Sequence, residues 1–241
     1  MLGLSAFANA VPTLQLGIAG GTYGAGTQTI IASSDSFSLY AYLIADAGNP
    51  INDIYGLSMA VTPQANSPAT LGSYTVNGNV IDVTSGMTYG IPPIDATIET
   101  TNGDDSHDLA SHSIFPTYFS ETTFSFSASN ESGVFNTADF PAFGPQAGTG
   151  MYYAKFDIDV TNLDKNYAIH FDLYNTKLIT CKSKDKVCVP KNLNITQFAP
   201  FSHDTESRPN DGDPPNETPE PAPMFLLGLG LLGMAWMRRK T

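Results

Sequence analysis

The sequence has little positive charge. Only 11 of its 241 residues are Lys or Arg, against 23 Asp and Glu, so the formal net charge is −12. A protein that binds nucleic acid through the phosphates needs a cluster of basic side chains that displaces counterions. This composition therefore excludes nucleic acid as a partner, and it also argues against binding to an anionic membrane surface.

Charged residues of both signs are scarce. They make up 14% of the chain, whereas an average soluble domain has about a quarter. The sequence is instead rich in Ser, Thr and Asn and contains 21 Gly and 17 Pro. This mixture favours short strands joined by turns and argues against a helical bundle. No stretch of residues 11–201 keeps a helical hydrophobic period for more than two turns.

The central part of the sequence contains a series of short segments typical of β-strands. They are residues 27–32, 36–43, 55–62, 73–84, 122–128, 152–160, 168–174 and 194–198. Within residues 73–84, the dipeptide Asn77-Gly78 predicts a hairpin with a two-residue turn. The sequence therefore predicts an all-β fold.

The last long pair of these segments is the most informative. In residues 152–160 and 168–174 apolar and polar residues alternate, which indicates strands with one buried face. The connection 161–167 is polar and short, so we expect the two strands to be antiparallel neighbours. We predict a single antiparallel β-sandwich, of jelly-roll or immunoglobulin-like type, over residues 11–201.

The segments before and after this body have different compositions. Residues 1–10 are a short apolar run that ends in Ala8-Asn9-Ala10, a small-residue pattern typical of signal-peptide cleavage. We interpret them as the remnant of a secretory signal peptide. Residues 202–218 contain no Val, Ile, Leu or aromatic side chain. This composition predicts a disordered, acidic, Pro-rich linker.

The C-terminal segment is an uncharged apolar run followed by cations. Residues 224–237 would form a helix about 21 Å long, whereas a bilayer core is about 30 Å thick. A short apolar helix of this kind is more typical of a sorting signal than of a permanent anchor. Arg238, Arg239 and Lys240 follow it, so we expect this end to face the cytoplasm while the rest of the chain is exported.

The tripeptide Pro219-Glu220-Pro221 precedes this helix. Together with the basic end, residues 219–241 resemble the PEP-CTERM sorting tail of exported proteins in Gram-negative bacteria. The resemblance implies that the partner of this chain is exosortase, an enzyme that removes the helix near the tripeptide. By the same resemblance, the helix anchors the chain in the inner membrane only transiently. It also implies an association with exopolysaccharide and biofilm systems.

The body resembles the choice-of-anchor N proteins. The segments that carry this second resemblance are residues 14–18, 20–23, 27–29, 114–119, 171–177 and 198–204. That group is defined by its varied C-terminal anchors and has no established activity. The resemblance therefore implies a location outside the cell and says nothing of chemistry.

The only two cysteines are Cys181 and Cys188. In an exported chain such a pair predicts a disulfide, here at the tip of a hairpin. The alternative is a metal or catalytic role for the thiols. Two cysteines supply half of a zinc site, however, and the loop between them contains no His.

No catalytic motif occurs in the sequence. It lacks the Gly-x-Ser-x-Gly elbow, the His-Glu-x-x-His zinc motif, a phosphate loop and a dinucleotide fingerprint. We therefore expect no catalytic residues and no enzyme activity. A secreted hydrolase remains as an alternative, because adjacent carboxylates can also serve glycoside hydrolysis.

Two acidic groups are weak candidates for a calcium site. The first is Asp104, Asp105 and Asp108, in a loop that also contains His107 and His112. The second is Asp157, Asp159 and Asp172, with His170, on the expected outward face of the strand pair. Oxygen ligands suit calcium. A solvated surface is the simpler interpretation of both groups, so we expect no cofactor and keep calcium as an alternative.

Three classes of function follow from these observations. The leading one is a non-enzymatic surface or matrix protein. The second is a carbohydrate- or calcium-binding module with tyrosines as the sugar-stacking platform, and the third is the hydrolase. The candidates for the platform are Tyr40, Tyr42, Tyr118, Tyr152 and Tyr153.

Overall fold

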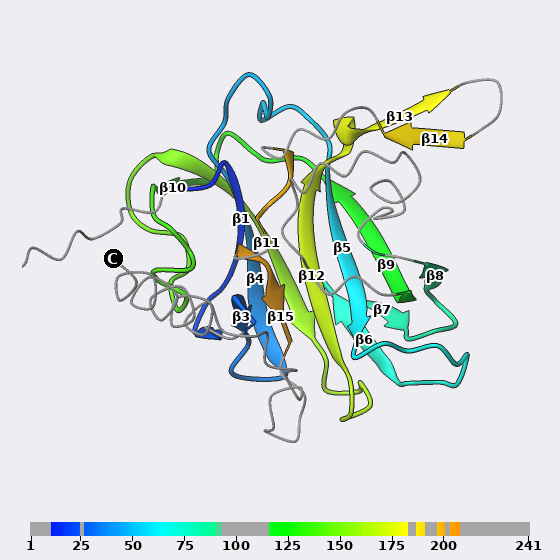
Figure 1. The fold of residues 1–241 in the computed structure, drawn as a ribbon. Coiled ribbons are helices and arrows are strands. Elements are labelled where there is room, and N and C mark those ends of the chain that lie inside the picture. The colour runs from blue at the N-terminus through cyan, green and yellow to red at the C-terminus, as the bar shows by residue number, and fades with distance from the viewer. Residues whose placement is uncertain are drawn as a thin grey trace, which may run out of the picture.

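We describe the fold from a computed structural model. It describes residues 11–24, 27–90, 92, 116–182, 187–190, 197–200 and 203–207. Over these ranges the chain forms β-strands and short 3-10 turns, among them η1 (Thr176–Leu178), and no α-helix (Figure 1). The all-β class is thereby confirmed. The expected signal-peptide remnant, the linker from residue 208 on, and the sorting helix at residues 224–237 lie outside the described residues.

One of the two large sheets has six strands. Its order is β1 (Leu14–Ile18), β4 (Ser36–Leu43), β11 (Gly150–Asp159), β6 (Ser73–Val76) and β7 (Asn79–Asp82), and β10 (Glu131–Gly133) also pairs with β11. Strands β6 and β7 form the hairpin that the sequence predicts. Its turn residues Asn77 and Gly78 both have positive φ, 51° and 78°, as such a turn requires.

The other large sheet has seven strands. Its order is β2 (Thr22–Gly24), β3 (Thr29–Ile31), β15 (Thr205–Glu206), β12 (Ala168–Asn175), β5 (Tyr55–Thr62), β9 (Thr117–Phe124) and β8 (Thr88–Gly90). All neighbours are antiparallel except β15 and β3. Because β15 lies inside this sheet, the folded body extends past residue 201, the boundary that composition predicts.

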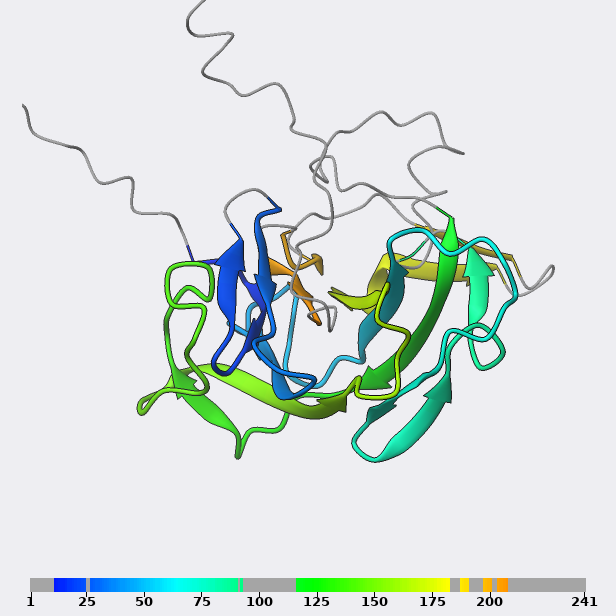
Figure 2. The same ribbon diagram turned by 90° about the horizontal axis from the view of Figure 1, so that it is seen from below.

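The two sheets pack against each other around one hydrophobic core (Figure 2). Leu16, Leu39 and Phe156 enter the core from the six-stranded sheet, and Leu57 and Phe171 enter it from the seven-stranded sheet. The fold is thus a two-sheet, largely antiparallel arrangement. Its jelly-roll or immunoglobulin-like type stays a prediction.

The expected pairing of the two alternating strands is wrong. Strand β11 lies in the six-stranded sheet and β12 in the seven-stranded one, so the connection between them crosses from one layer to the other. Phe156 and Phe171 nevertheless both face the core. Alternation shows only that one face of a strand is buried. Two such strands can be neighbours in one sheet, or they can lie in two facing sheets and bury their apolar faces against each other.

A third, two-stranded sheet projects from the body (Figure 1). It consists of β13 (Ile179–Lys182) and β14 (Val187–Pro190), and its register places Cys181 directly opposite Cys188. The Cα atoms of residues paired in this way are about 4.5–5.5 Å apart, within the range that a disulfide spans. The predicted hairpin is confirmed, and the disulfide stays a prediction.

Candidate functional site

The first candidate site lies on the face of β12 that points away from the core. Alternation places Ile169 and Phe171 in the core and His170 and Asp172 on the opposite face. This second face is not solvated as the sequence predicts, because the exposed fractions of His170 and Asp172 are only 9% and 3%. Every residue of β12 is buried, and the expected outward surface is therefore wrong for this strand.

Strand β15 brings two further carboxylates to His170. Glu206 is the register partner of His170, and Asp204 directly precedes the strand. His170 Nε2 lies 3.2 Å from Asp204 Oδ2 and 3.6 Å from Asp172 Oδ1, while its Nδ1 lies 3.4 Å from Glu206 Oε2. The imidazole therefore has a carboxylate at each nitrogen. We call these four residues the His170 cluster.

Burial and charge act in opposite directions on this cluster. Burial alone would lower the pKa of His170, but the charges of Asp204 and Asp172 outweigh it and raise that pKa well above its usual value. Burial raises the pKa of Asp204 to about 6, against the opposing influence of His170. Both His170 and Asp204 therefore keep their protons to a higher pH than they would in water.

A buried hydroxyl borders the cluster. Ser58 on β5 is the register partner of Asp172 on β12, so its side chain lies on the same face of the sheet. The Ser58 side chain is fully buried. Within the part of the chain that the structure describes, its Oγ has no hydrogen-bond partner.

His203 directly precedes Asp204 in the sequence, but its environment differs from that of His170. Its Nε2 lies 2.8 Å from Asn136 Oδ1, and burial lowers its pKa to about 4. His203 is therefore neutral near pH 7 and belongs to the packing between this segment and the loop after β10. Its role differs from that of His170.

Sequence reasoning missed Asp204 and Glu206 because it assigned them to the linker. The segment around them has few apolar residues, and a strand of two residues is too short to show alternation. The available signal is the spacing itself. His170-x-Asp172 and Asp204-x-Glu206 each place two ligand-type side chains on one face of a strand.

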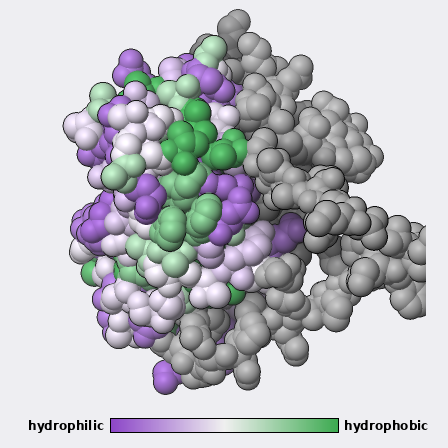
Figure 3. Space-filling view, turned by 90° about the vertical axis from the view of Figure 1, so that its left-hand side faces the viewer, coloured by the Kyte–Doolittle hydropathy of each residue, from purple (hydrophilic) through white to green (hydrophobic). Residues whose placement is uncertain are grey.

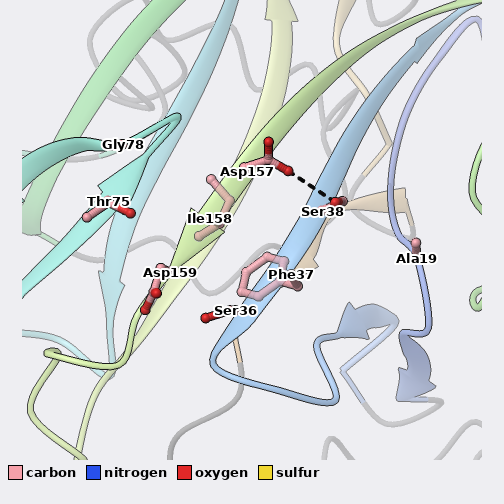
Figure 4. Close-up of a pocket in the computed structure, with 9 residues that line it drawn as sticks. All are labelled: Ala19, Ser36, Phe37, Ser38, Thr75, Gly78, Asp157, Ile158 and Asp159. Atoms are coloured by element: carbon pink, nitrogen blue, oxygen red, sulfur yellow. Dashed lines mark hydrogen bonds between the residues drawn. The ribbon is translucent and has the colours of Figure 1, made fainter.

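The second candidate site is a groove on the outer face of the six-stranded sheet, with a volume of about 480 Å³ (Figure 4). It is lined by Ser38, Asp157 and Asp159, together with Ala19, Ser36, Phe37, Thr75, Gly78 and Ile158. The Ser38 hydroxyl donates a hydrogen bond to Asp157 Oδ1 over 3.2 Å. The groove is open, and its lining is polar and apolar in about equal parts.

The two aspartates of the groove do not converge on one point. Asp157 pairs with Lys155 over 2.7 Å, and the hydrogen bond from Lys155 lowers the pKa of Asp157. Asp159 accepts a hydrogen bond from the Thr161 backbone N–H over 2.8 Å. Asp172 lies in the other sheet. The predicted set of Asp157, Asp159 and Asp172 is therefore not one site.

Exposed aromatic side chains lie next to this groove. Phe140 and Phe143, in the loop between β10 and β11, are 47% and 41% exposed, and their rings stack with centroids 5.1 Å apart. Figure 3 shows apolar side chains gathered on the side of the molecule that carries this loop. The Gly20 N–H donates a hydrogen bond to Ala142 O over 2.9 Å, which holds this Phe140–Phe143 patch beside Ala19 at the edge of the groove.

The five tyrosines predicted as a sugar platform do not form one. Tyr42 is fully buried, and Tyr118 and Tyr152 pack against the main core. Tyr40 and Tyr153 stay partly exposed on the outer face, where their rings meet edge to face at 6.0 Å and both pack against Tyr42. Alternation had implied that some of the five must be core residues, and the fold shows which.

The remaining candidates lie outside the described residues. They are the loop aspartates Asp104, Asp105 and Asp108, and the sorting residues Pro219, Glu220, Pro221, Arg238, Arg239 and Lys240. In the ranges that the structure describes, no helix has the length and apolar character needed to cross a bilayer.

Comparison with known proteins identifies the C-terminal segment. Residues 217–240 match the family model of the PEP-CTERM protein-sorting motif. No curated protein and no solved structure matches the chain. The chain therefore carries a PEP-CTERM sorting signal, which marks an exported protein that exosortase sorts and that is associated with the cell surface.

Proposed function

We propose that this chain is a non-enzymatic protein of the cell surface or extracellular matrix of a Gram-negative bacterium, and that it works within an exopolysaccharide or biofilm layer. The sorting motif at residues 217–240 is the observation that carries this proposal. The acidic, strand-rich body without a catalytic motif is consistent with it. The resemblance of the body to choice-of-anchor N proteins belongs to the same proposal.

The order of events follows from the C-terminal segment. The apolar run 224–237, with Arg238, Arg239 and Lys240 behind it, holds the exported chain transiently in the inner membrane. Exosortase then cleaves near Pro219-Glu220-Pro221 and releases the body toward the surface. The linker before the tripeptide keeps the folded body away from the membrane during this step.

Deletion of exosortase from the native host tests the proposal. We expect the chain to move from the surface and medium into the inner-membrane fraction, in a form that keeps Arg238–Lys240, as mass spectrometry of the C-terminus would show. Alanine at Pro219, Glu220 and Pro221 should have the same effect in a host that has exosortase. The matched control places alanine at Pro214 and Pro215, which lie in the linker.

A surface product that retains Arg238–Lys240 would contradict processing. The matrix role needs a second arm, in which polysaccharide synthesis is blocked. We then expect the processed chain to appear in the medium instead of the matrix. An unchanged distribution would contradict the matrix role and leave only the sorting part of the proposal standing.

Carbohydrate binding is the second candidate function, and the groove favours it. Sugars are bound by polar side chains that fix the hydroxyls and by aromatic faces on which the rings stack. Ser38 and Asp157 offer polar atoms along the groove, and the Phe140–Phe143 patch supplies exposed rings at its edge.

A glycan array of acidic and neutral exopolysaccharide fragments tests this candidate. We expect Phe140→Ala and Asp157→Asn each to weaken binding at least about tenfold, since each removes one of the few strong contacts. Val80→Ala is the control, because Val80 is 66% exposed and does not line the groove. Binding that survives both substitutions would exclude the groove as the site.

A further inference from the structure

We propose that the His170 cluster binds one divalent transition-metal ion of the zinc type. His170 Nε2, Asp172 and Asp204 are the ligands, and Glu206 holds the imidazole from its other nitrogen. This inference is independent of the sorting signal and of the carbohydrate groove. It rests on the positions of the donor atoms, on their burial and on the hydroxyl of Ser58.

The register of β12 and β15 assembles the donor set. Residues two apart on a strand point to the same face, so His170 and Asp172 share one face of β12, and Asp204 and Glu206 share one face at β15. The strands are antiparallel, with His170 opposite Glu206. All four side chains therefore come to the same face of the seven-stranded sheet.

The distances fit a tetrahedral ion. A metal bound at 2.0–2.2 Å holds its ligand atoms about 3.4 Å apart. His170 Nε2 lies 3.2 Å from Asp204 Oδ2 and 3.6 Å from Asp172 Oδ1. The donor atoms of these three residues all lie within 4.8 Å of one another. An ion can enter with small side-chain movements, and its charge offsets that of two buried carboxylates.

Glu206 has the position of an outer-shell partner. Metal-binding histidines usually donate the N–H of the other ring nitrogen to a carboxylate, which fixes the tautomer and orients the ring. Glu206 Oε2 lies 3.4 Å from His170 Nδ1, on the side away from the two aspartates. Nδ1–H then donates to Glu206, and the lone pair of Nε2 points toward Asp172 and Asp204.

Ser58 supplies an independent observation. Carboxylates that bind a metal are themselves hydrogen-bonded. The buried Ser58 hydroxyl lies on the same sheet face beside Asp172, and within the described ranges its Oγ has no hydrogen-bond partner. It is positioned to donate to Asp172 when that carboxylate turns toward an ion.

The donor set selects the class of metal. Calcium takes six to eight oxygen ligands, whereas one imidazole nitrogen with two carboxylates suits zinc and its first-row neighbours. The ion would also join β15, a strand of only two residues, to the long strand β12. Because the linker to the sorting signal begins just after β15, the metal would secure the last strand of the body at that point.

Titration of the full-length chain, purified without a polyhistidine tag and stripped with a chelator, tests the proposal. We expect one Zn²⁺ per chain by calorimetry and an increase in Tm on binding, since a ligand of the native state stabilises it. Co²⁺ should give a visible spectrum of tetrahedral nitrogen and oxygen ligation. A thiolate charge-transfer band would instead place the metal on Cys181 and Cys188 and overturn the proposal.

Variants separate the ligands from their surroundings. Asp204→Asn should lower the Zn²⁺ affinity at least about 100-fold, while Glu206→Gln should keep one ion per chain and weaken binding about 10- to 100-fold. Asp157→Asn is the matched control, an exposed aspartate in the other sheet, and should not change the affinity.

Three results would overturn the proposal. The first is that the folded wild-type chain binds neither Zn²⁺ nor Co²⁺. The second is that a folded Asp204→Asn chain binds Zn²⁺ with unchanged affinity, and the third is that the chain binds Ca²⁺ but not Zn²⁺. If Asp204→Asn fails to fold, the Co²⁺ spectrum of the wild type and the Zn²⁺ affinity of Glu206→Gln decide whether the metal binds at the His170 cluster.

Discussion

Replacing Gly72 with alanine is expected to lower the free energy of unfolding by more than about 3 kcal/mol. Gly72 has φ +85°, which alone costs an L-residue about 1–2 kcal/mol. A Cβ there would lie 2.0 Å from Asn162 O and 3.2 Å from Asp164 N. Both are backbone atoms, which cannot move aside as the end of a flexible side chain can, so strain and collision add.

The collision matters because of where Gly72 lies. It forms an isolated bridge with Leu163, and the Ser73 N–H donates a hydrogen bond to Asn162 O over 3.0 Å. These contacts join the start of β6 to the connection that crosses from one sheet to the other. A side chain at this position would therefore push that connection away from the six-stranded sheet.

Gly78→Ala is the matched control for this prediction. Gly78 has a similar φ of +78°, but nothing lies within 4 Å of a Cβ built on it. We expect it to cost only about 1–2 kcal/mol, the price of the backbone conformation. Urea unfolding of both variants gives the comparison, and equal losses would show that the collision at Gly72 is relieved by a small movement.

Phe171→Ala is expected to lower the free energy of unfolding by about 3–5 kcal/mol, because it removes a large buried ring and leaves a cavity. Phe171 is fully buried in the seven-stranded sheet, and its ring meets that of Phe37 from the six-stranded sheet at 6.1 Å and 84°. The ring pair therefore joins the two layers.

A double-mutant cycle with Phe37→Ala measures the contact between the sheets, for which we expect a coupling of about 0.5–1.5 kcal/mol. Phe143→Ala serves as the control, because its ring is partly exposed and packs in the loop after β10. The unfolding curve should keep one transition in each variant. Two separate transitions would mean that the sheets unfold independently, contrary to a shared core.

The candidate site shows why sequence spacing carries only part of the information. His170 and Asp172 stand out as a pair because they are two residues apart on a strongly alternating strand. Asp204 and Glu206 follow more than thirty residues later, in a segment whose composition is that of a linker. Only the register between β12 and β15 joins the two pairs, and no pattern within either segment encodes that register.

The sequence alone predicted the features that depend on residues close together in the chain. The bounds of β4 and β5, the turn at Asn77-Gly78 and the sorting signal at the C-terminus all follow from alternation, turn chemistry or composition over short windows. Tertiary structure alone decided which sheet each strand joins, that β12 is buried on both faces, and that His170 meets three carboxylates. The physical reason is that a strand's sequence records how many of its residues avoid water, whereas the identity of the covering layer depends on contacts between residues far apart in the chain.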